Sequence, residues 1–407
     1  MHRTDACVVG GGPAGSAIAI FLRRQGIDVT LLEKARMPRP KPCGESLSPE
    51  AVPILRELGV LEQIRGTAHG RLRGFDIYPY GAAPFRGAYA ARSGGNPDRA
   101  AGLAVPRTAL DTVLLRAAKA AGADVREGWA VNDVGTWNGR ERLLAGRDAQ
   151  GGRFTLRARL VIGADGVHST VARRIHVACP STRLQQVAIV THMRGVRDTS
   201  DYGETHAAVG GYCGIAPLAG DLANVAIVLP AASMRERLRE AGSIEQCFRA
   251  FISTCPHLAP RMLDAEIVAG PWTTSGLACH VRRRVDDGLM LVGDAGGYFD
   301  PFTGEGIFRA LRSAELAAGT ASKALRRGDT GRAALAAYAA AYRRQFVPKR
   351  LVELIVHEVI TRRRLFEHVA ARLRGKPALA DAMIGVTGDF LSPYEVLSPW
   401  YLARLLF

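Results

Sequence analysis

The sequence predicts an α/β fold in which a Rossmann-like parallel sheet is interleaved along the chain with an antiparallel sheet and is followed by C-terminal helices. Three observations lead to this prediction. A glycine cluster at residues 10–15 directly follows a short apolar run that is typical of a buried parallel strand. Two further motifs that combine glycine and aspartate, at residues 163–169 and 293–306, also follow apolar runs. From Gly331 onward the pattern of apolar residues is helical.

The N-terminal segment has the pattern of a βαβ unit. Residues 6–9 are predicted to form the first strand, residues 16–24 a helix and residues 28–32 a second strand. The second strand ends at Glu33, about 18 residues after Gly15, which is close to the spacing expected of the acidic residue that binds a ribose. The segment therefore predicts a dinucleotide site, and the alternative is a glycine turn that binds nothing.

Each glycine of this motif has a physical reason in a dinucleotide site. Gly10 permits a tight turn, Gly12 lets the backbone approach a pyrophosphate, and Gly15 lets the helix and the strand pack closely. The helix N-terminus offers unpaired N–H groups and the positive end of its dipole to phosphates. The Glu33 carboxylate would accept hydrogen bonds from the adenosine ribose and would repel a 2′-phosphate, which argues against NADP at this site. The candidate cofactor-binding residues of this segment are Gly10, Gly12, Pro13, Ala14, Gly15, Glu33 and Lys34.

The two later motifs indicate which dinucleotide is bound. Residues 160–162 and 289–292 are predicted strands that lead into the second and third motifs, and ligands bind at the carboxyl ends of such strands. Asp294 could accept a hydrogen bond from a ribityl hydroxyl group. The helix predicted at residues 307–316 could direct its N-terminus at the part of a flavin ring that becomes negative on reduction. The three motifs together predict a flavin pocket.

In these motifs the chain resembles the FAD-dependent aromatic-hydroxylase superfamily, which also contains the geranylgeranyl reductases and the flavin halogenases. The resemblance covers nearly the whole chain and is weakest after about Gly328. It implies a glutathione-reductase-type FAD-binding domain, bound FAD, and NADH or NADPH as a transient reductant. It also implies that Arg107 is the arginine at a helix start that contacts FAD in the family. The further cofactor candidates are Arg107, Asp165, Gly166, Gly293, Asp294, Pro301, Gly304, Gly306 and Ile307.

The subfamily signals conflict. Residues 293–307 and 41–44 are most similar to the geranylgeranyl reductases, which often carry a cysteine near the isoalloxazine, as Cys43 would be here. Residues 44–47 resemble the halogenases, but the two tryptophans of their Trp-x-Trp-x-Ile-Pro segment are absent from residues 211–217, and no match for their lysine is found.

The same segment also departs from the reductases, which carry Tyr-x-Trp-x-Phe-Pro. Tyr212 and Pro217 are retained, whereas Gly214 and Ala216 replace the two bulky residues and would open the wall of a substrate site. The candidate substrate-lining residues are therefore Tyr212, Gly214 and Pro217.

The function predicted from these features is that of an FAD-dependent, NAD(P)H-using monooxygenase. It would hydroxylate a lipophilic aromatic, phenolic or polyketide-type substrate through a flavin C4a-hydroperoxide. The alternative is a geranylgeranyl-reductase-like enzyme that reduces prenyl double bonds, while a halogenase and a non-catalytic flavin-binding protein are less favoured. The candidate catalytic residues are Cys43, Glu45, Ser46 and Pro301.

Each of these catalytic candidates has a structural alternative. Cys43 could be a small packing residue, and Glu45 could cap a helix that begins near residues 48–50. No general base is identified, because four candidate histidines are each interpreted as structural or exposed: His168, His192, His206 and His280.

The length and composition of the chain are consistent with one compact enzyme, and no apolar run is long enough to span a membrane. The chain of 407 residues is 47% apolar, and its seven scattered cysteines favour a reducing cytoplasm and give no metal-binding spacing. The start of the chain is interpreted as the first strand rather than a signal peptide. The net charge of +16 is attributed to solvated arginines, with attraction of NAD(P)H or of a membrane surface as the alternative. No aromatic-basic module for nucleic acid is found.

The C-terminal region is basic and partly apolar. Residues 349–357 and 362–366 combine both characters, and residues 394–407 are unusually apolar. We expect the last segment to dock on the core, and the alternative is peripheral contact with lipid or with a lipophilic substrate. The oligomeric state is left open.

The predicted domains are discontinuous along the chain. The FAD-binding domain comprises residues 1–74, 100–174 and 282–325, the substrate domain residues 75–99 and 175–281, and the C-terminal helical region residues 326–407. Strands are expected in the substrate domain at residues 186–194, 206–209 and 224–229, and residues 76–99 are expected to form an inserted loop.

Overall fold

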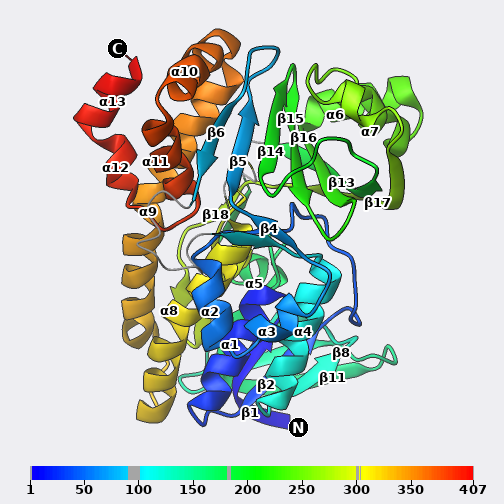
Figure 1. The fold of residues 1–407 in the computed structure, drawn as a ribbon. Helices are drawn as coiled ribbons and strands as arrows, with labels where there is room; N and C mark the ends of the chain where they lie inside the picture. The colour runs from blue at the N-terminus through cyan, green and yellow to red at the C-terminus, as the bar shows by residue number, and fades with distance from the viewer. Residues whose placement is uncertain (1, 90–100, 181–184, 299–301, 303, 407) are drawn as a thin grey trace.

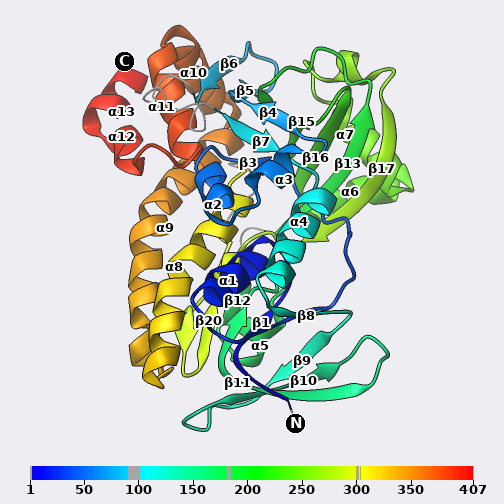
Figure 2. The same ribbon diagram turned by 60° about the horizontal axis from the view of Figure 1, so that its bottom comes forward.

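The computed structural model describes residues 2–89, 101–180, 185–298, 302 and 304–406. A parallel sheet with its helices forms one end of the molecule, an antiparallel sheet forms the other, and the C-terminal helices run along one side of both (Figures 1 and 2). The fold is therefore the mixed α/β architecture that the sequence predicts.

The larger sheet brings together the strands that precede the three motifs. Its main path runs β19 (Val285–Asp286), β20 (Leu289–Leu291), β11 (Arg153–Gly163), β1 (His2–Val9), β2 (Val29–Glu33) and β8 (Asp124–Glu127), and β10 (Arg142–Arg147) and β9 (Ala130–Val134) extend it beside β11. Strands β1, β11 and β20 are parallel, with Val9 opposite Gly163 and Gly163 opposite Leu291. The three motifs therefore begin side by side at one edge of the sheet.

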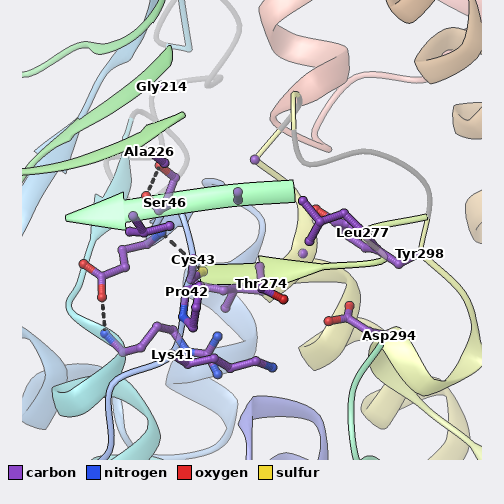
Figure 3. Close-up of a pocket in the computed structure, with 18 of the residues that line it drawn as sticks. Lys41, Pro42, Cys43, Ser46, Gly214, Ala226, Thr274, Leu277, Asp294 and Tyr298 are labelled. Atoms are coloured by element: carbon purple, nitrogen blue, oxygen red, sulfur yellow. Dashed lines mark hydrogen bonds between the residues drawn. The ribbon is translucent and has the colours of Figure 1, made fainter. Parts of the chain in front are cut away.

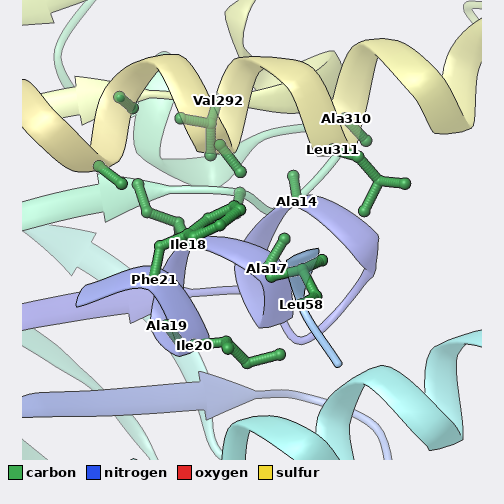
Figure 4. Close-up of a cluster of buried hydrophobic side chains, with 14 of the residues drawn as sticks. Ala14, Ala17, Ile18, Ala19, Ile20, Phe21, Leu58, Val292, Ala310 and Leu311 are labelled. Atoms are coloured by element: carbon green, nitrogen blue, oxygen red, sulfur yellow. The ribbon is translucent and has the colours of Figure 1, made fainter. Parts of the chain in front are cut away.

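Three helices cover this sheet on the side of the first motif. Helix α1 (Pro13–Arg24) packs between α8 (Gly306–Arg327) and α4 (Arg107–Ala120), and it begins three residues before the predicted start. In Figure 4, Ile18 and Phe21 of α1 pack below Val292 and α8. Every residue of α1 from Pro13 to Leu22 is buried, so its first turn cannot move without disturbing the core.

The second sheet is built mainly from the middle of the chain. Its order is β17 (Glu266–Ser275), β13 (Gln186–Arg194), β16 (Leu222–Pro230), β15 (Gly211–Pro217), β14 (Gly203–Ala208), β5 (Gly74–Tyr78) and β6 (Phe85–Ala88). Helices α6 (Ala231–Ala241) and α7 (Ile244–Ile252) cover one face, where Phe248 and Phe251 pack against Ile215 and Ile227. The other face is left for the cavity described below.

The prediction of an inserted loop at residues 76–99 is wrong for its first part. Strands β5 and β6 form an antiparallel hairpin, and β5 pairs with β14 in parallel. Pro79, Gly81 and Pro84 lie in the turn of the hairpin, while Ile77 and Phe85 are buried as strand residues. Residues 90–99 lie outside the described part of the chain.

Short elements connect the two sheets. Strand β7 (Gly102–Ala104) lies between β3 (Ser46–Leu47) and β4 (Gly70–Leu72), and β12 (Ala178–Pro180) pairs with β18 (Cys279–Val281). Helices α2 (Ala51–Glu57), α3 (Leu61–Arg65) and α5 (Thr170–Arg174) are also short.

The C-terminal region consists of the helices α9 (Arg332–Thr361), α10 (Arg363–Gly375), α11 (Pro377–Thr387), α12 (Pro393–Leu397) and α13 (Pro399–Leu406). Of these, α9 packs on α8, and α10 and α11 pack on the β5–β6 hairpin. Tyr401 and Leu405 of α13 are buried in the same apolar cluster as Phe85 and Phe366. The last segment therefore docks on the rest of the protein, as expected for residues 394–407. None of the helices described is long and apolar enough to cross a membrane.

Candidate active site

The three sequence motifs line one cavity between the two sheets. This follows from the sheet register, because the carboxyl ends of β1, β11 and β20 meet at one edge. The motif residues that line the cavity are Gly12, Pro13, Ala14, Ala164, Gly166, Val167, Gly293, Asp294, Gly304, Gly306 and Ile307.

Two glycines are required by the geometry of the first motif. Gly10 has a φ of +105°, and a Cβ atom there would lie 2.5 Å from the carbonyl oxygen of Ala164. A Cβ atom on Gly15 would lie 1.8 Å from the carbonyl oxygen of Gly10. These two glycines fix the turn that presents Gly12 to the cavity, but they do not line it themselves.

Glu33 and Lys34 lie beside the first motif but not in the cavity wall. The buried Glu33 carboxylate accepts hydrogen bonds from the backbone N–H groups of Gly11 at 2.6 Å and Ala35 at 2.9 Å. It therefore already stabilises the turn, and ribose binding would use its remaining acceptor capacity. Lys34 is exposed and has no contact with the cavity, so the geometry does not support its predicted role.

The carboxylate of Asp165 is directed at a helix rather than at the cavity. It accepts hydrogen bonds from the Ser169 hydroxyl at 2.5 Å and from the backbone N–H groups of Thr170 at 2.6 Å and Val171 at 3.2 Å. Asp165 therefore caps α5, and its predicted contact with the cofactor stays a prediction. Its neighbour Gly166 does line the cavity.

Asp294 offers a test of whether the cavity fits FAD. Its Oδ1 atom is buried and has no hydrogen-bond partner within the described part of the chain, although the residue lines the cavity. A buried oxygen without a donor is costly, and a ligand hydroxyl group would satisfy it. The unpaired Asp294 oxygen could accept a hydrogen bond from the ribityl part of FAD, and the turn that presents Gly12 leaves room for the pyrophosphate. The residues of the cavity therefore fit FAD. The predicted contact from Pro301 lies outside the described residues.

Two cationic side chains lie in the wall opposite Asp294. Arg107 begins α4 and forms two hydrogen bonds of 2.7 Å with the Asp111 carboxylate. Lys41 projects into the same cavity (Figure 3), and burial, together with the nearby Arg107, lowers the pKa of its ammonium group. Sequence reasoning assigned no role to Lys41, although it stands in the motif that led to Cys43.

Glu45 joins the antiparallel sheet to the start of α4 at the cavity. It has a φ of +57° and is buried, and its Oε1 atom accepts a hydrogen bond of 2.7 Å from the backbone N–H of Arg107. Its Oε2 atom lies 2.8 Å from Nε2 of His192 and 3.1 Å from Nδ2 of Asn224. Glu45 therefore caps a helix, but that helix is α4 and not the one near residues 48–50. His192, interpreted from sequence as structural or exposed, is one of its partners.

Cys43 and Ser46 both line the cavity on the same segment (Figure 3). The Cys43 sulfur accepts a hydrogen bond of 3.3 Å from the backbone N–H of Glu45. Ser46 lies beside the third motif, since a Cβ atom on Gly304 would be 3.8 Å from the Cβ atom of Ser46. Both candidates are therefore placed where they could contact a ligand.

The antiparallel sheet forms the opposite wall with small side chains. Tyr212, Gly214 and Ala216 alternate along β15 toward the cavity, and Ala226 of the neighbouring strand lies beside them. Pro217 is not among the residues that line this cavity, and its predicted contact with the substrate stays a prediction.

A second, apolar cavity of about 110 Å³ lies between the β5–β6 hairpin and the C-terminal helices. Phe302 lines both cavities, and its ring meets that of Tyr212 edge-on with centroids 5.0 Å apart. Among the described side chains that line it, only Thr387 and Tyr401 carry hydroxyl groups, and both donate to backbone carbonyls. This cavity suits an apolar chain rather than water or a polar ligand.

Five buried charged residues lie behind the N-terminus of α8. Nζ of Lys349 is 3.0 Å from Oε2 of Glu305 and is also paired with Asp389, while Arg309 is paired with Glu353 and lies 3.6 Å from Glu305. The three carboxyl groups of Glu305, Asp389 and Glu353 face two cations, Lys349 and Arg309. One of the three carboxyl groups therefore keeps its proton to a higher pH than it would in water. Burial, with repulsion from Asp389 and Glu353, raises the pKa of Glu305 to about 8.

Comparison with known proteins places this cavity in context. A protein from Dictyostelium discoideum named conditioned medium factor receptor 1 is 29% identical to this chain. The alignment covers 82% of this chain and 66% of that protein. Digeranylgeranylglycerophospholipid reductase of Methanothrix thermoacetophila is 30% identical, covering 83% of this chain and 82% of the relative. Menaquinone reductase of Mycolicibacterium smegmatis is also 30% identical, and the alignment covers 78% of this chain and 76% of that protein.

Solved structures share the fold. A geranylgeranyl bacteriochlorophyll reductase-like protein from Thermoplasma acidophilum superimposes with a TM-score of 0.82 at 24% identity, covering 100% of this chain and 98% of the other. A flavin-dependent brominase superimposes with a TM-score of 0.83 at 20% identity, covering 98% and 99%. The sequence profile of the FAD binding domain family matches residues 3–354. This chain therefore belongs to the FAD binding domain family, within the superfamily of FAD-dependent oxidoreductases.

Proposed function

We propose that this protein reduces carbon–carbon double bonds in a long-chain lipophilic substrate with FAD as its cofactor and NADH or NADPH as the electron source. One observation carries the proposal: an apolar cavity adjoins the cofactor cavity, and Phe302 borders both. A reactive double bond could lie in the first cavity while the rest of an apolar chain occupies the second.

The relatives at about this level of similarity support a lipid substrate. The Methanothrix protein is named as a reductase of a geranylgeranyl phospholipid and the Mycolicibacterium protein as a reductase of menaquinone. Both names describe reduction of a molecule too apolar to be held by a polar pocket alone.

The residues of the chain would have distinct parts in this reaction. FAD, when bound and reduced, supplies a hydride. Gly12 and Asp294 would hold the cofactor, and the apolar wall around Ala226 would exclude water from the reacting bond. The double bond also needs a proton at its second carbon, and Cys43 and Ser46, which line the cavity and carry exchangeable protons, would supply it.

Hydroxylation of a lipophilic aromatic substrate is the second candidate function. It is favoured by the small side chains of Gly214, Ala216 and Ala226, which leave room for a ring beside Tyr212. Halogenation is less favoured, because residues 211–217 lack both tryptophans of the halogenase segment.

One experiment separates the two reactions. The FAD-loaded protein would be incubated with NADH or NADPH and a prenylated naphthoquinone, without oxygen and with oxygen, and the products weighed by mass spectrometry. Reduction of the chain predicts a gain of two hydrogen atoms per double bond in both atmospheres, and this gain must persist after any quinol is oxidised back to the quinone. A gain of one oxygen atom only in air would reject the reductase and support the hydroxylase.

A further inference from the structure

Helix α9 exposes a stripe of apolar side chains. Val347, Leu351, Leu354 and Ile355 are between 40% and 55% exposed, whereas apolar residues on the other side of the same turns, such as Val352, are buried. Their spacing of four, seven and eight residues from Val347 places them on one face of the helix. Soluble surfaces rarely expose such contiguous rows without a partner.

The stripe continues onto the last two helices. Helix α12 contacts both α9 and α13, and the three lie together along one side of the molecule in Figures 1 and 2. Tyr394 of α12 is 67% exposed, and Trp400 and Leu402 of α13 are 63% and 37% exposed. We call these seven side chains the α9–α13 face: Val347, Leu351, Leu354, Ile355, Tyr394, Trp400 and Leu402.

The apolar cavity opens on this face. Ile355 and Leu402 belong to the exposed face and also line the cavity, so its mouth lies between α9 and α13. At the inner end the cavity reaches Phe302 and so the candidate active site. Apolar side chains therefore line the cavity from the surface to Phe302, which also borders the cofactor cavity.

Positive charge borders the face. Residues 341–376 contain ten Lys or Arg and only three Glu. Arg343 and Arg344 precede the stripe, Arg364 follows it, and all three are exposed. The guanidinium group of Arg404 stacks over the ring of Trp400 at 4.5 Å, an arrangement that combines an aromatic side chain with a cation at the edge of an apolar surface.

We propose that the α9–α13 face docks on an anionic membrane and presents the mouth of the apolar cavity to the acyl chains. Basic residues around an apolar surface complement anionic headgroups. A second copy of this chain fits less well, because a twofold contact would place the arginine borders against each other. The use of the cavity as a substrate entrance rests on the proposed function, whereas docking does not.

Vesicle binding tests the docking directly. Full-length protein would be sedimented with phosphatidylcholine vesicles and with vesicles that also contain phosphatidylglycerol. We expect binding that needs the anionic lipid, decreases with salt, and decreases at least about tenfold in the double variant Leu351→Glu/Leu354→Glu. The matched control is Leu263→Glu, at an apolar residue that is 76% exposed outside the face and should bind as wild type. Equal losses in both variants, or no binding by wild type, would overturn the proposal.

Two further measurements keep the alternatives apart. Lipids brominated on their acyl chains should quench the fluorescence of Trp400, and this quenching should disappear in Trp400→Phe; quenching that persists unchanged would count against docking through α13. Sedimentation velocity without vesicles detects whether the protein forms a dimer. If the wild type does not bind vesicles and its dimer is dissociated by Leu351→Glu/Leu354→Glu, the face joins two copies of the chain instead. Because neither measurement needs turnover, an inactive protein that still binds vesicles would reject the reductase and retain the docking.

Discussion

The Nε2 atom of His192 lies 2.8 Å from the Oε2 atom of Glu45, and this contact joins the antiparallel sheet to the segment that lines the cofactor cavity. The other carboxylate oxygen of Glu45 accepts from the backbone N–H of Arg107, so one side chain also holds the start of α4. Cys43 and Ser46 flank Glu45 in sequence and are positioned by the same contacts. We therefore regard Glu45 as a positioning residue for the candidate active site.

Replacing Glu45 with Gln should destabilise the protein. The amide oxygen of the glutamine can keep the bond from the Arg107 N–H, but its NH2 group would then face the Nδ2 group of Asn224, which is also a donor. We expect a loss of about 1–3 kcal/mol in the free energy of unfolding and a lower content of bound FAD after purification. Thermal unfolding and flavin absorbance measure both. Glu62→Gln, on an exposed side chain, is the control, and equal behaviour of the two variants would contradict the role given to Glu45.

Replacing Asp294 with Ala should weaken FAD binding and leave the fold intact. The Oδ1 atom has no hydrogen-bond partner within the described part of the chain, so its loss removes no internal bond that the structure shows. A hydrogen bond to a charged acceptor is worth about 1.5–3 kcal/mol, which corresponds to roughly a tenfold to hundredfold rise in the dissociation constant. Flavin fluorescence titration of the apoprotein measures it, with the exposed Asp221→Ala as control. Unchanged affinity would remove Asp294 from the set of cofactor contacts.

Replacing Gly214 with Trp should narrow the substrate site without unfolding the protein. A Cβ atom at Gly214 would meet nothing closer than the backbone oxygen of Glu204 at 3.9 Å, so a side chain can extend into the cavity. We expect a change of less than about 1 kcal/mol in stability and a fall of at least about tenfold in kcat/KM for ring-bearing substrates. Gly81→Trp is the control, since a Cβ atom there meets nothing within 4 Å. Turnover that is unaffected in Gly214→Trp would show that the substrate does not use this wall.

The parts of the site that depend on residues close together in sequence could be predicted, and the contacts between residues far apart in sequence could not. The three motifs could be found because each follows an apolar strand, and parallel strands bring their carboxyl ends together. The partners of Glu45 could not be found, since His192 and Asn224 are 147 and 179 residues away and belong to another sheet. Asp165 was assigned to the cofactor from the resemblance of its Asp-Gly motif, and only the fold shows that its carboxylate accepts hydrogen bonds from the N-terminus of α5.

The buried cluster behind α8 predicts how stability depends on pH. The pKa of the Glu305 carboxyl rises to about 8 in the folded protein from its ordinary value of 4.5, because burial penalises its charge and Asp389 and Glu353 repel it. Between these two values the folded protein holds more protons than the unfolded chain, so the stability falls as the pH rises from about 4.5 to about 8, by at most about 1.4 kcal/mol per pH unit from this group.

The variant Glu305→Gln should remove this dependence, because Gln is neutral at every pH and leaves the two cations, Lys349 and Arg309, paired with Asp389 and Glu353. The melting temperature of wild type should fall between about pH 5 and pH 8 relative to that of the variant, and the two curves should run parallel above about pH 8. Glu62→Gln should follow wild type throughout. If the difference between Glu305→Gln and wild type is constant with pH, Glu305 is ionised in the folded protein and the surplus proton is held elsewhere in the cluster.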